Sequence, residues 1–272
     1  MCITRKYPQQ FLFCIVSDWV LVAVDAGVRL QVNMINLMLG DCLERMKEIP
    51  DGSVDMILCD LPYGTTACKW DSVIPFEPLW EQYRRVAKRN AAIVLTASQP
   101  FTTSLIGSNM RDFRYDIVWR KVRVTGHLNA KKMPLREHES VLVFYRKLPT
   151  YNPQMTPSKG HIRGPRGKRA EATTVYGSFL DDSSGQNAAS EYYPRSTIEF
   201  RSDMQPVHPT QKPVALMEYL IKTYTNEGET VLDNCMGSGT VGVACKNLNR
   251  KFIGIEKDET YFKIAQDRIA AI

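Results

Sequence analysis

The sequence predicts one large domain, or one domain with an inserted module, built around an α/β sheet. Short apolar runs typical of buried strands alternate along the chain with amphipathic segments of helical length. The 272 residues are 44% hydrophobic and 24% charged, the balance of a soluble globular protein with ample material for a core. Near the C-terminus, a glycine-rich turn joins a strand to a helix, as in nucleotide-binding α/β folds.

The elements of the first half are expected in β-α order. Apolar residues alternate at 35–39 as in a strand, and a short helix at 43–49 ends at Pro50 before an Asp-Gly turn. A run of branched side chains at 54–59 indicates a buried strand. The segment 76–89 is expected to be an amphipathic helix, because its apolar residues fall on one face.

The later elements continue this alternation. Strands are expected in apolar runs at 91–97, 115–119, 140–145, 230–233 and 251–255. Helices are expected from Pro100, at 213–224 with Pro213 in the first turn, at 239–247 and at 259–270.

The first 33 residues differ from the rest of the chain. Residues 11–28 are apolar and follow two basic residues, as in a signal peptide or membrane span, but two aspartates interrupt them and no small-residue cleavage site follows. Two interpretations stay open: a peripheral helix or strand, or sequence translated from upstream of a start at Met34 or Met38. The second is favoured, because the recognisable pattern of the chain begins only near Met34.

Basic residues are concentrated in two tracts. Residues 111–147 contain ten Lys and Arg against four acids, an excess equal to the whole formal net charge of +6. Residues 159–169 contain five basic residues and no acid. Such tracts fit a nucleic-acid partner as well as a solvated surface. Prolines, glycines, serines and charges dominate 149–207, as in a linker or a recognition insert.

The seven cysteines form no C-x-x-C pair and no cluster with the four histidines. This spacing predicts reduced thiols in a cytosolic setting, without structural zinc or disulfides.

The segment Gly237–Gly242 reads G-x-G-x-x-G between a predicted strand and a predicted helix. Glycine allows a tight turn and a close approach of ligand to backbone, and the helix start offers free N–H groups. Glu256 ends the next strand, 23 residues after Asp233, where a carboxylate can accept bonds from ribose hydroxyls. The arrangement predicts a nucleoside-binding site.

NAD is one candidate ligand for this site. Only 30 residues follow Gly242, however, which is too few for the further strands of a dinucleotide-binding half. The sheet must therefore be completed from the N-terminal part of the chain, which disfavours an NAD oxidoreductase.

Asp60-Leu61-Pro62-Tyr63 follows the predicted strand at 54–59. It places a carboxylate, a rigid turn and an aromatic ring at the strand's carboxyl end, where ligands bind in open α/β sheets. The segment resembles the Asp-Pro-Pro-Tyr signature of the DNA amino-methyltransferases, with Leu61 in place of the first proline. His208–Pro213 resembles the segment that leads into the cofactor half in the class whose catalytic motif precedes the cofactor motif. The resemblance covers 34–272.

This resemblance implies a Rossmann-like, circularly permuted S-adenosylmethionine-dependent methyltransferase sheet. It implies a catalytic half at 34–148, an irregular target-recognition insert at 149–207 and a cofactor half at 208–272, after an N-terminal extension at 1–33. The implied cofactor is S-adenosylmethionine, and the implied cofactor-binding residues are Asp41, Cys42, Thr210, Lys212, Asp233, Gly237, Gly239 and Glu256. One departure is that the family's Asp-Pro-Phe reads Asp233-Asn234-Cys235, which predicts weaker cofactor affinity.

The implied catalytic residues are Asp60, Pro62 and Tyr63. Asp60 would accept one N–H of the target amine, a backbone carbonyl of Leu61 or Pro62 would accept the other, and Tyr63 would stack on the base. Asp60 favours adenine N6, because cytosine-N4 enzymes of the class more often carry serine there. The alternatives are a cytosine-N4 enzyme and a nucleoside-binding or DNA-binding protein without turnover.

The implied partner is double-stranded DNA with an extruded base. The residues expected to contact the DNA are Lys131, Lys132, Arg136, Arg163 and Arg166. The resemblance further implies a bacterial or phage-encoded enzyme of the cytoplasm, without a membrane partner. It allows a cognate restriction endonuclease and fits either a monomer or a homodimer.

Overall fold

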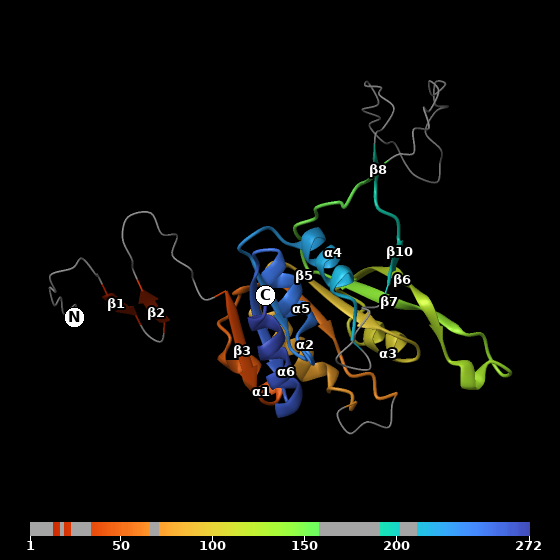
Figure 1. The fold of residues 1–272 in the computed structure, drawn as a ribbon, viewed down its shortest axis with the longest axis horizontal. Helices are drawn as coiled ribbons and strands as arrows, with labels where there is room; N and C mark the ends of the chain where they lie inside the picture. The colour runs from red at the N-terminus through yellow and green to blue at the C-terminus, as the bar shows by residue number, and fades with distance from the viewer. Residues whose placement is uncertain (1–12, 17–18, 23–33, 66–70, 158–190, 202–210) are drawn as a thin grey trace, which may run out of the picture.

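An eight-stranded sheet forms the centre of the computed structural model, which describes residues 13–16, 19–22, 34–65, 71–157, 191–201 and 211–272 (Figure 1). The order of the strands is β10-β6-β7-β5-β4-β11-β12-β3, and β7 runs antiparallel to both of its neighbours while the other adjacent pairs are parallel. The strands are β3 (Ile35–Leu39), β4 (Val54–Asp60), β5 (Ala87–Ala97), β6 (Phe113–Thr125), β7 (Arg136–Phe144), β10 (Thr197–Phe200), β11 (Thr230–Asp233) and β12 (Lys251–Glu256).

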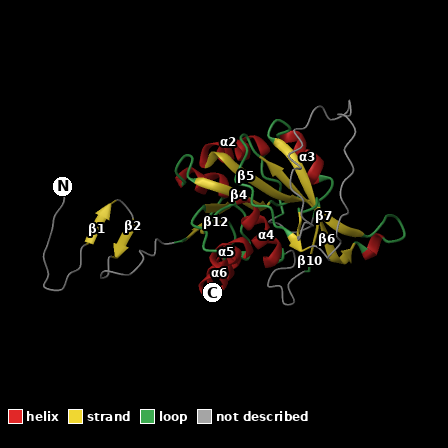
Figure 2. Ribbon diagram, turned by 90° about the horizontal axis from the view of Figure 1, so that it is seen from above, coloured by secondary structure: helices red, strands yellow, loops and turns green. Residues whose placement is uncertain are grey.

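Helices cover both faces of this sheet. The helices are α1 (Cys42–Arg45), η1 (Met46–Glu48), α2 (Phe76–Val86), α3 (Phe101–Ser108), η2 (His127–Asn129), α4 (Val214–Tyr224), α5 (Thr240–Asn247) and α6 (Glu259–Ala270). Figure 2 shows α2 and α3 on one face and α4, α5 and α6 on the other. The chain therefore folds as three layers, helix, sheet and helix, and the predicted α/β class is confirmed.

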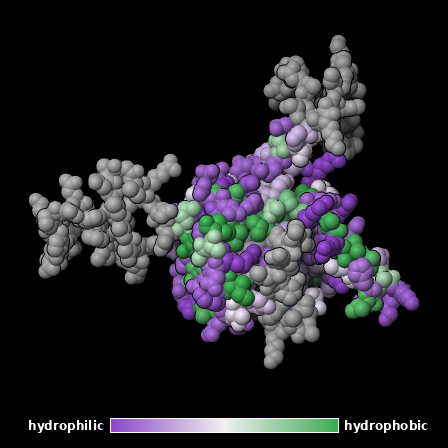
Figure 3. Space-filling view, viewed as in Figure 1, coloured by the Kyte–Doolittle hydropathy of each residue, from purple (hydrophilic) through white to green (hydrophobic). Residues whose placement is uncertain are grey.

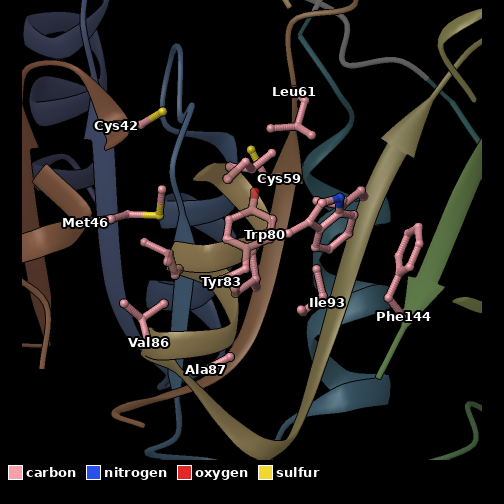
Figure 4. Packing of buried hydrophobic residues seen from close by; sticks show 14 of the residues in the cluster. Cys42, Met46, Cys59, Leu61, Trp80, Tyr83, Val86, Ala87, Ile93 and Phe144 are labelled. Carbon is pink, nitrogen blue, oxygen red and sulfur yellow. The ribbon is translucent and has the colours of Figure 1, made fainter. Parts of the chain in front are cut away.

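The two helical layers define two hydrophobic cores. Successive residues of a strand point to opposite faces, so β4 sends Ile57 and Cys59 into one core and Met56 and Leu58 into the other. The first core includes Trp80 from α2 (Figure 4), and the second is built with α4, α5 and α6. Because its side chains are buried on both faces, β4 reads as a continuous apolar run, and this is why the sequence identified it.

The C-terminal strands complete the sheet from the middle rather than from an edge. Strand β11 lies between β4 and β12, and its register pairs Leu232 with Ile57. Since β4 and β11 are parallel, their carboxyl ends open at the same edge of the sheet. Asp60 and Asp233, which end these two strands, therefore come to one edge although 173 residues separate them in the sequence.

Three segments differ from the boundaries expected of them. Helix α2 ends at Val86 rather than at 89, because Ala87 already pairs with Val54 at the start of β5. Strands β6 and β7 are much longer than their apolar runs and continue as a two-stranded ribbon whose residues are largely exposed, so hydrophobicity did not mark them. Within the stretch expected to be irregular, β10 pairs with β6 and extends the main sheet.

Two short antiparallel pairs lie outside the main sheet, β1 (Phe13–Val16) with β2 (Trp19–Val22) and β8 (Thr156–Pro157) with β9 (Glu191–Tyr192). Strands β1 and β2 fall in the region for which a peripheral strand was one open interpretation. Across the described ranges, no helix has the length and apolar character needed to cross a membrane. Thr210, Arg163 and Arg166 lie outside the described residues.

The glycine turn before α5 provides a test of packing. Gly239 has φ +77°, and a Cβ added there would lie 2.9 Å from Cβ of Ala265 in α6, whereas Gly228 has φ +78° and open space around the same position. We expect Gly228→Ala to lower the free energy of unfolding by about 1–2 kcal/mol, the cost of positive φ alone. Gly239→Ala should cost roughly 2 kcal/mol more, because α6 must shift. Equal losses in denaturant titrations would contradict the packing of α5 on α6.

Candidate active site

A cleft of about 1550 Å³ opens at the carboxyl ends of β4 and β11. This volume exceeds the roughly 300–1,000 Å³ of a site for one small molecule, so the cleft has room for two ligands. Residues of both halves of the chain line it, including Asp60 and Tyr63 from the first half and Lys212, Asp233 and Gly237 from the second.

The loop after β4 is held in place by hydrogen bonds around Asp60. One oxygen of the Asp60 carboxylate, Oδ1, accepts hydrogen bonds from the Tyr63 hydroxyl at 2.7 Å and from the Thr96 hydroxyl on neighbouring β5. Phe101 stacks on the Tyr63 ring with 5.1 Å between centroids. Burial, together with the nearby Asp60 and Glu139 carboxylates, raises the pKa of Tyr63 well above its usual range, so the phenol stays protonated and donates to Asp60.

The residues after Tyr63 are tied back by a second carboxylate. Asp71 is buried, and its two oxygens accept hydrogen bonds from the backbone N–H groups of Gly64 at 2.8 Å and Thr65 at 2.9 Å. This carboxylate fixes the course of the loop that leaves the Asp60 turn.

A chain of alternating charges starts at the second oxygen of Asp60. Lys212 Nζ lies 2.6 Å from Asp60 Oδ2 and 3.4 Å from Glu139 Oε2, and Lys121 forms an ion pair with Glu139 Oε1. The side chains of Lys212 and Glu139 are only 9% and 11% exposed, so their charges require partners. Burial lowers the pKa of Lys212, but Asp60 and Glu139 outweigh it and the net pKa is raised. The ammonium therefore stays charged.

The opposite lobe of the cleft is formed by the glycine turn and the carboxylates of Asp41, Asp233 and Glu256. Gly237 donates its N–H to Glu256 Oε2 at 2.8 Å, while Oε1 of Glu256 accepts from Lys257 and Asp258. Asp41 caps α1 by accepting from Leu43 N at 3.0 Å, and its other oxygen faces Lys257 at 3.4 Å. A carboxylate offers about four lone pairs, so Glu256 and Asp41 can each accept further bonds from a ligand.

Two thiols, Cys59 and Cys235, lie against Asp233 beneath this lobe, and a third, Cys42, lies against Cys235. Cys42, Cys59 and Asp233 are buried, Cys235 is half-buried, and the four described cysteines, these three and Cys245, are free thiols. A side-chain hydrogen bond to Cys235, followed by burial, raises the pKa of the Cys42 thiol, and burial raises that of Cys59. These thiols are therefore neutral packing groups at pH 7.

Asn234, which stands where the family carries proline, links the turn to α2. Its side chain is buried and its Oδ1 accepts a 2.6 Å hydrogen bond from the Tyr83 hydroxyl. Tyr83 lies in the first core near Cys59 and Cys42 (Figure 4). At this position the departure from the motif thus replaces proline with a side chain that supports the turn by a hydrogen bond, while Cys235 stands where the motif has its aromatic residue.

Basic residues follow the β6–β7 ribbon away from the cleft. Arg136 lines the cleft, whereas Lys131 and Lys132 are exposed in the turn between the two strands. Leu128, at the same end of the ribbon, is fully exposed. Figure 3 shows hydrophilic and hydrophobic side chains side by side on this projecting arm.

The sequence-derived site residues do not all meet. The cleft gathers Asp60, Pro62, Tyr63, Asp41, Cys42, Lys212, Asp233, Gly237, Glu256 and Arg136. Gly239 lies behind the turn against α6. Sequence reasoning missed Glu139, Lys121 and Thr96, which reach the Asp60 network from β7, β6 and β5. The only sequence signal for Glu139 is a charged residue directly before the apolar run of β7.

Comparisons with known proteins agree on one family. The model of the N6/N4 "DNA methylase" family matches residues 54–267. Two curated relatives are type II methyltransferases. M.HpaI of Haemophilus parainfluenzae is 27% identical over 86% of this chain and 73% of its own length. M.BglII of Bacillus subtilis is 30% identical over 83% of this chain and 66% of its own length. The chain thus spans slightly less than two thirds of M.BglII.

Solved structures share the fold. A crystal structure of M1.HpyAVI in complex with SAM is 26% identical, with a TM-score of 0.58 over 86% of this chain and 99% of the other. The cytosine-N4-specific PvuII DNA methyltransferase is 13% identical, with a TM-score of 0.62 over 86% of this chain and 88% of the other. At this identity the likeness supports the fold alone.

The protonation of Asp233 predicts a pH effect on stability. Burial raises the pKa of Asp233 from 3.8 to about 7, against the opposing hydrogen bond from Cys235 N. Between these values the native chain holds a proton that the unfolded chain has lost, so the free energy of unfolding falls as pH rises through this window. Between pH 5 and 7, we expect the free energy of unfolding of wild type to fall, relative to that of Asp233→Asn, by up to about 1 kcal/mol per pH unit. Above pH 7 the free energies of unfolding of wild type and Asp233→Asn should depend on pH in the same way.

Denaturant titrations across this pH range measure the effect. Asp51→Asn, which removes an exposed carboxylate from a turn, serves as the control for the loss of one charge. A constant difference between wild type and Asp233→Asn would mean that Asp233 is already ionised at pH 5.

Proposed function

Because the chain belongs to the DNA methylase family of N6/N4 methyltransferases, we propose that it transfers a methyl group from S-adenosylmethionine to N6 of adenine in double-stranded DNA. The observation that carries this proposal is the position of Asp60. Its carboxylate ends β4, is oriented by two hydroxyls, and opens into the same cleft as the glycine turn after β11.

The chemistry assigned to Asp60 is hydrogen-bond acceptance. The lone pair of an adenine amine is delocalised into the ring, and accepting both N–H groups favours a pyramidal nitrogen with a localised lone pair. Asp60 Oδ2 accepts one N–H, and a backbone carbonyl of Leu61 or Pro62 accepts the other. Tyr63, backed by Phe101, provides a ring for the base to stack on, worth about 1–3 kcal/mol.

The second lobe of the cleft fits S-adenosylmethionine by charge and shape. A Cβ added at Gly237 would meet no atom within 4 Å, so the backbone there is open to close approach. Asp41, Asp233 and Glu256 surround this opening, and their carboxylates suit the ammonium, the adenine amine and the ribose hydroxyls of the cofactor. When bound, the cofactor supplies an electrophilic methyl group on a sulfonium.

The proposed reaction is one displacement without a covalent enzyme intermediate. The bond from methyl to sulfur breaks as the bond from methyl to nitrogen forms, sulfur keeps the electron pair, and the methylated nitrogen releases one proton to solvent. The role of the chain is to align the amine with the methyl group, exclude water and stabilise the charge that develops on nitrogen.

The DNA partner is assigned to the basic ribbon and the insert. A base inside a duplex cannot reach Asp60, so the target must be extruded at a cost of a few kcal/mol. Arg136 lines the cleft, and Lys131 and Lys132 lie in the turn at the end of the β6–β7 ribbon, where they can hold phosphates. The insert at 149–207 is proposed to read the flanking bases.

A second candidate is transfer to cytosine N4. The family match covers N4 as well as N6 methyltransferases and therefore fits this alternative. The residue at the end of β4 favours adenine, since cytosine-N4 enzymes more often carry serine where Asp60 stands.

Transfer of tritium from labelled S-adenosylmethionine to DNA tests the proposal. We expect label in N6-methyladenine after nucleoside analysis. We also expect Asp60→Ala to slow transfer by at least about 100-fold, because the oriented acceptor is lost, while cofactor affinity stays within about threefold. The control Asp51→Ala removes an exposed carboxylate and should transfer at the wild-type rate.

Three results would contradict the proposal. Label in N4-methylcytosine would replace the adenine assignment, and cofactor binding without any transfer would point to a non-catalytic binder. Near-normal turnover by Asp60→Ala would remove the assigned catalytic group.

A further inference from the structure

We propose that Lys212 blocks the target-base site before DNA binds, and that Glu139 is the positioning residue that receives the Lys212 ammonium when the base enters. The inference rests on the proposed function, because it names a step in base capture at the same site. It holds for either an adenine or a cytosine amine.

The Lys212 ammonium contacts the groups that the reaction assigns to the base. Its Nζ donates to Asp60 Oδ2 at 2.6 Å, the oxygen left to the target amine once Tyr63 and Thr96 occupy Oδ1. The same nitrogen lies 5.6 Å from the centroid of the Tyr63 ring, on which the base would stack. A base amine and the lysine ammonium are both N–H donors and therefore compete for one acceptor.

Glu139 offers the ammonium a second position. Its Oε2 is buried and accepts no hydrogen bond from the described residues, and it lies 3.4 Å from Lys212 Nζ. A buried carboxylate oxygen without a hydrogen bond is costly, and a small movement of Lys212 would satisfy it. The other oxygen, Oε1, is fixed by its ion pair with Lys121 on β6, which holds Glu139 in place.

Two carboxylates allow this exchange without exposing a charge. A buried ammonium that lost Asp60 alone would be left unpaired, which is strongly unfavourable. Because Glu139 lies next to Lys212, the ammonium can release Asp60 Oδ2 to the base and stay paired with Glu139. The movement also takes a positive charge away from a nitrogen that gains positive charge during transfer.

The prediction concerns the transfer step rather than binding. We expect Glu139→Gln, which keeps size but removes charge, to leave Lys212 on Asp60. The single-turnover rate of transfer should fall by about tenfold or more, because a charge-assisted hydrogen bond to the displaced ammonium is lost. The KM for DNA and for S-adenosylmethionine should stay within about threefold. Glu199→Gln on β10 removes an exposed carboxylate of the same sheet and serves as the matched control.

A double-mutant cycle shows whether Glu139 acts through Lys212. In a Lys212→Met background the ammonium is absent, so adding Glu139→Gln should change the rate by less than about twofold. The proposal would be overturned if Glu139→Gln lowered the transfer rate equally in the wild-type and Lys212→Met backgrounds. It would also be overturned if Glu139→Gln transferred at the same rate as Glu199→Gln.

Base extrusion provides a measurement that does not require the Glu139 variant to fold. DNA that carries 2-aminopurine next to the target base, whose position methylome sequencing identifies, should fluoresce more strongly with Lys212→Met than with wild type, because no ammonium competes with the target amine. Unchanged fluorescence would overturn the proposal. The wild-type transfer rate tests the proposed function separately: a wild type that methylates DNA while Glu139→Gln matches its control sinks this inference alone.

Discussion

The ion pair between Asp60 and Lys212 joins the two halves of the chain at the point where the chemistry is proposed. The carboxylate ends β4, and Lys212, 152 residues later in the sequence, lies just before Pro213, the N-cap of α4. Lys212 is buried, so its charge is tolerated only while Asp60 and Glu139 surround it. The ion pair therefore forms only when the C-terminal half docks on the first half, and residues of both halves are needed to complete the cleft.

The sheet explains how a circularly permuted chain achieves this docking. The strands at the centre, β4 and β11, come from opposite ends of the sequence but are parallel and in register. Parallel strands place their carboxyl ends at one edge, so one cleft receives the loop after Asp60 and the glycine turn after Asp233. The order of the motifs along the chain is thus of no consequence for the reaction, because only their meeting at this edge matters.

Much of the fold could be predicted from the sequence, because buried strands and capped helices leave local signals. The apolar run of β4, Pro213 before α4 and the glycine turn before α5 all fell where hydrophobicity and backbone chemistry placed them. The ribbon of β6 and β7 and the edge strand β10 carry no such run, and their pairing comes from the adjoining strand.

The candidate site was predictable where it rests on motifs. Glu139 and Lys121 could not be predicted as site residues, because only the antiparallel register of β6 and β7 brings them to Lys212. Lys212 itself was expected among the cofactor-binding residues, and the described contacts place its ammonium on Asp60. The assignment of S-adenosylmethionine as cofactor is confirmed by the family match and the related structure in complex with SAM.

The central claim is that one cleft brings a sulfonium methyl and an extruded base amine together beside Asp60. A crystal structure with target DNA and sinefungin, an unreactive analogue of the cofactor, tests it most directly. We predict that the base amine lies within hydrogen-bond distance of Asp60 Oδ2 and about 3–3.5 Å from the analogue's transferable position. A base bound away from Asp60, or an analogue bound away from the turn at Gly237, would contradict the account.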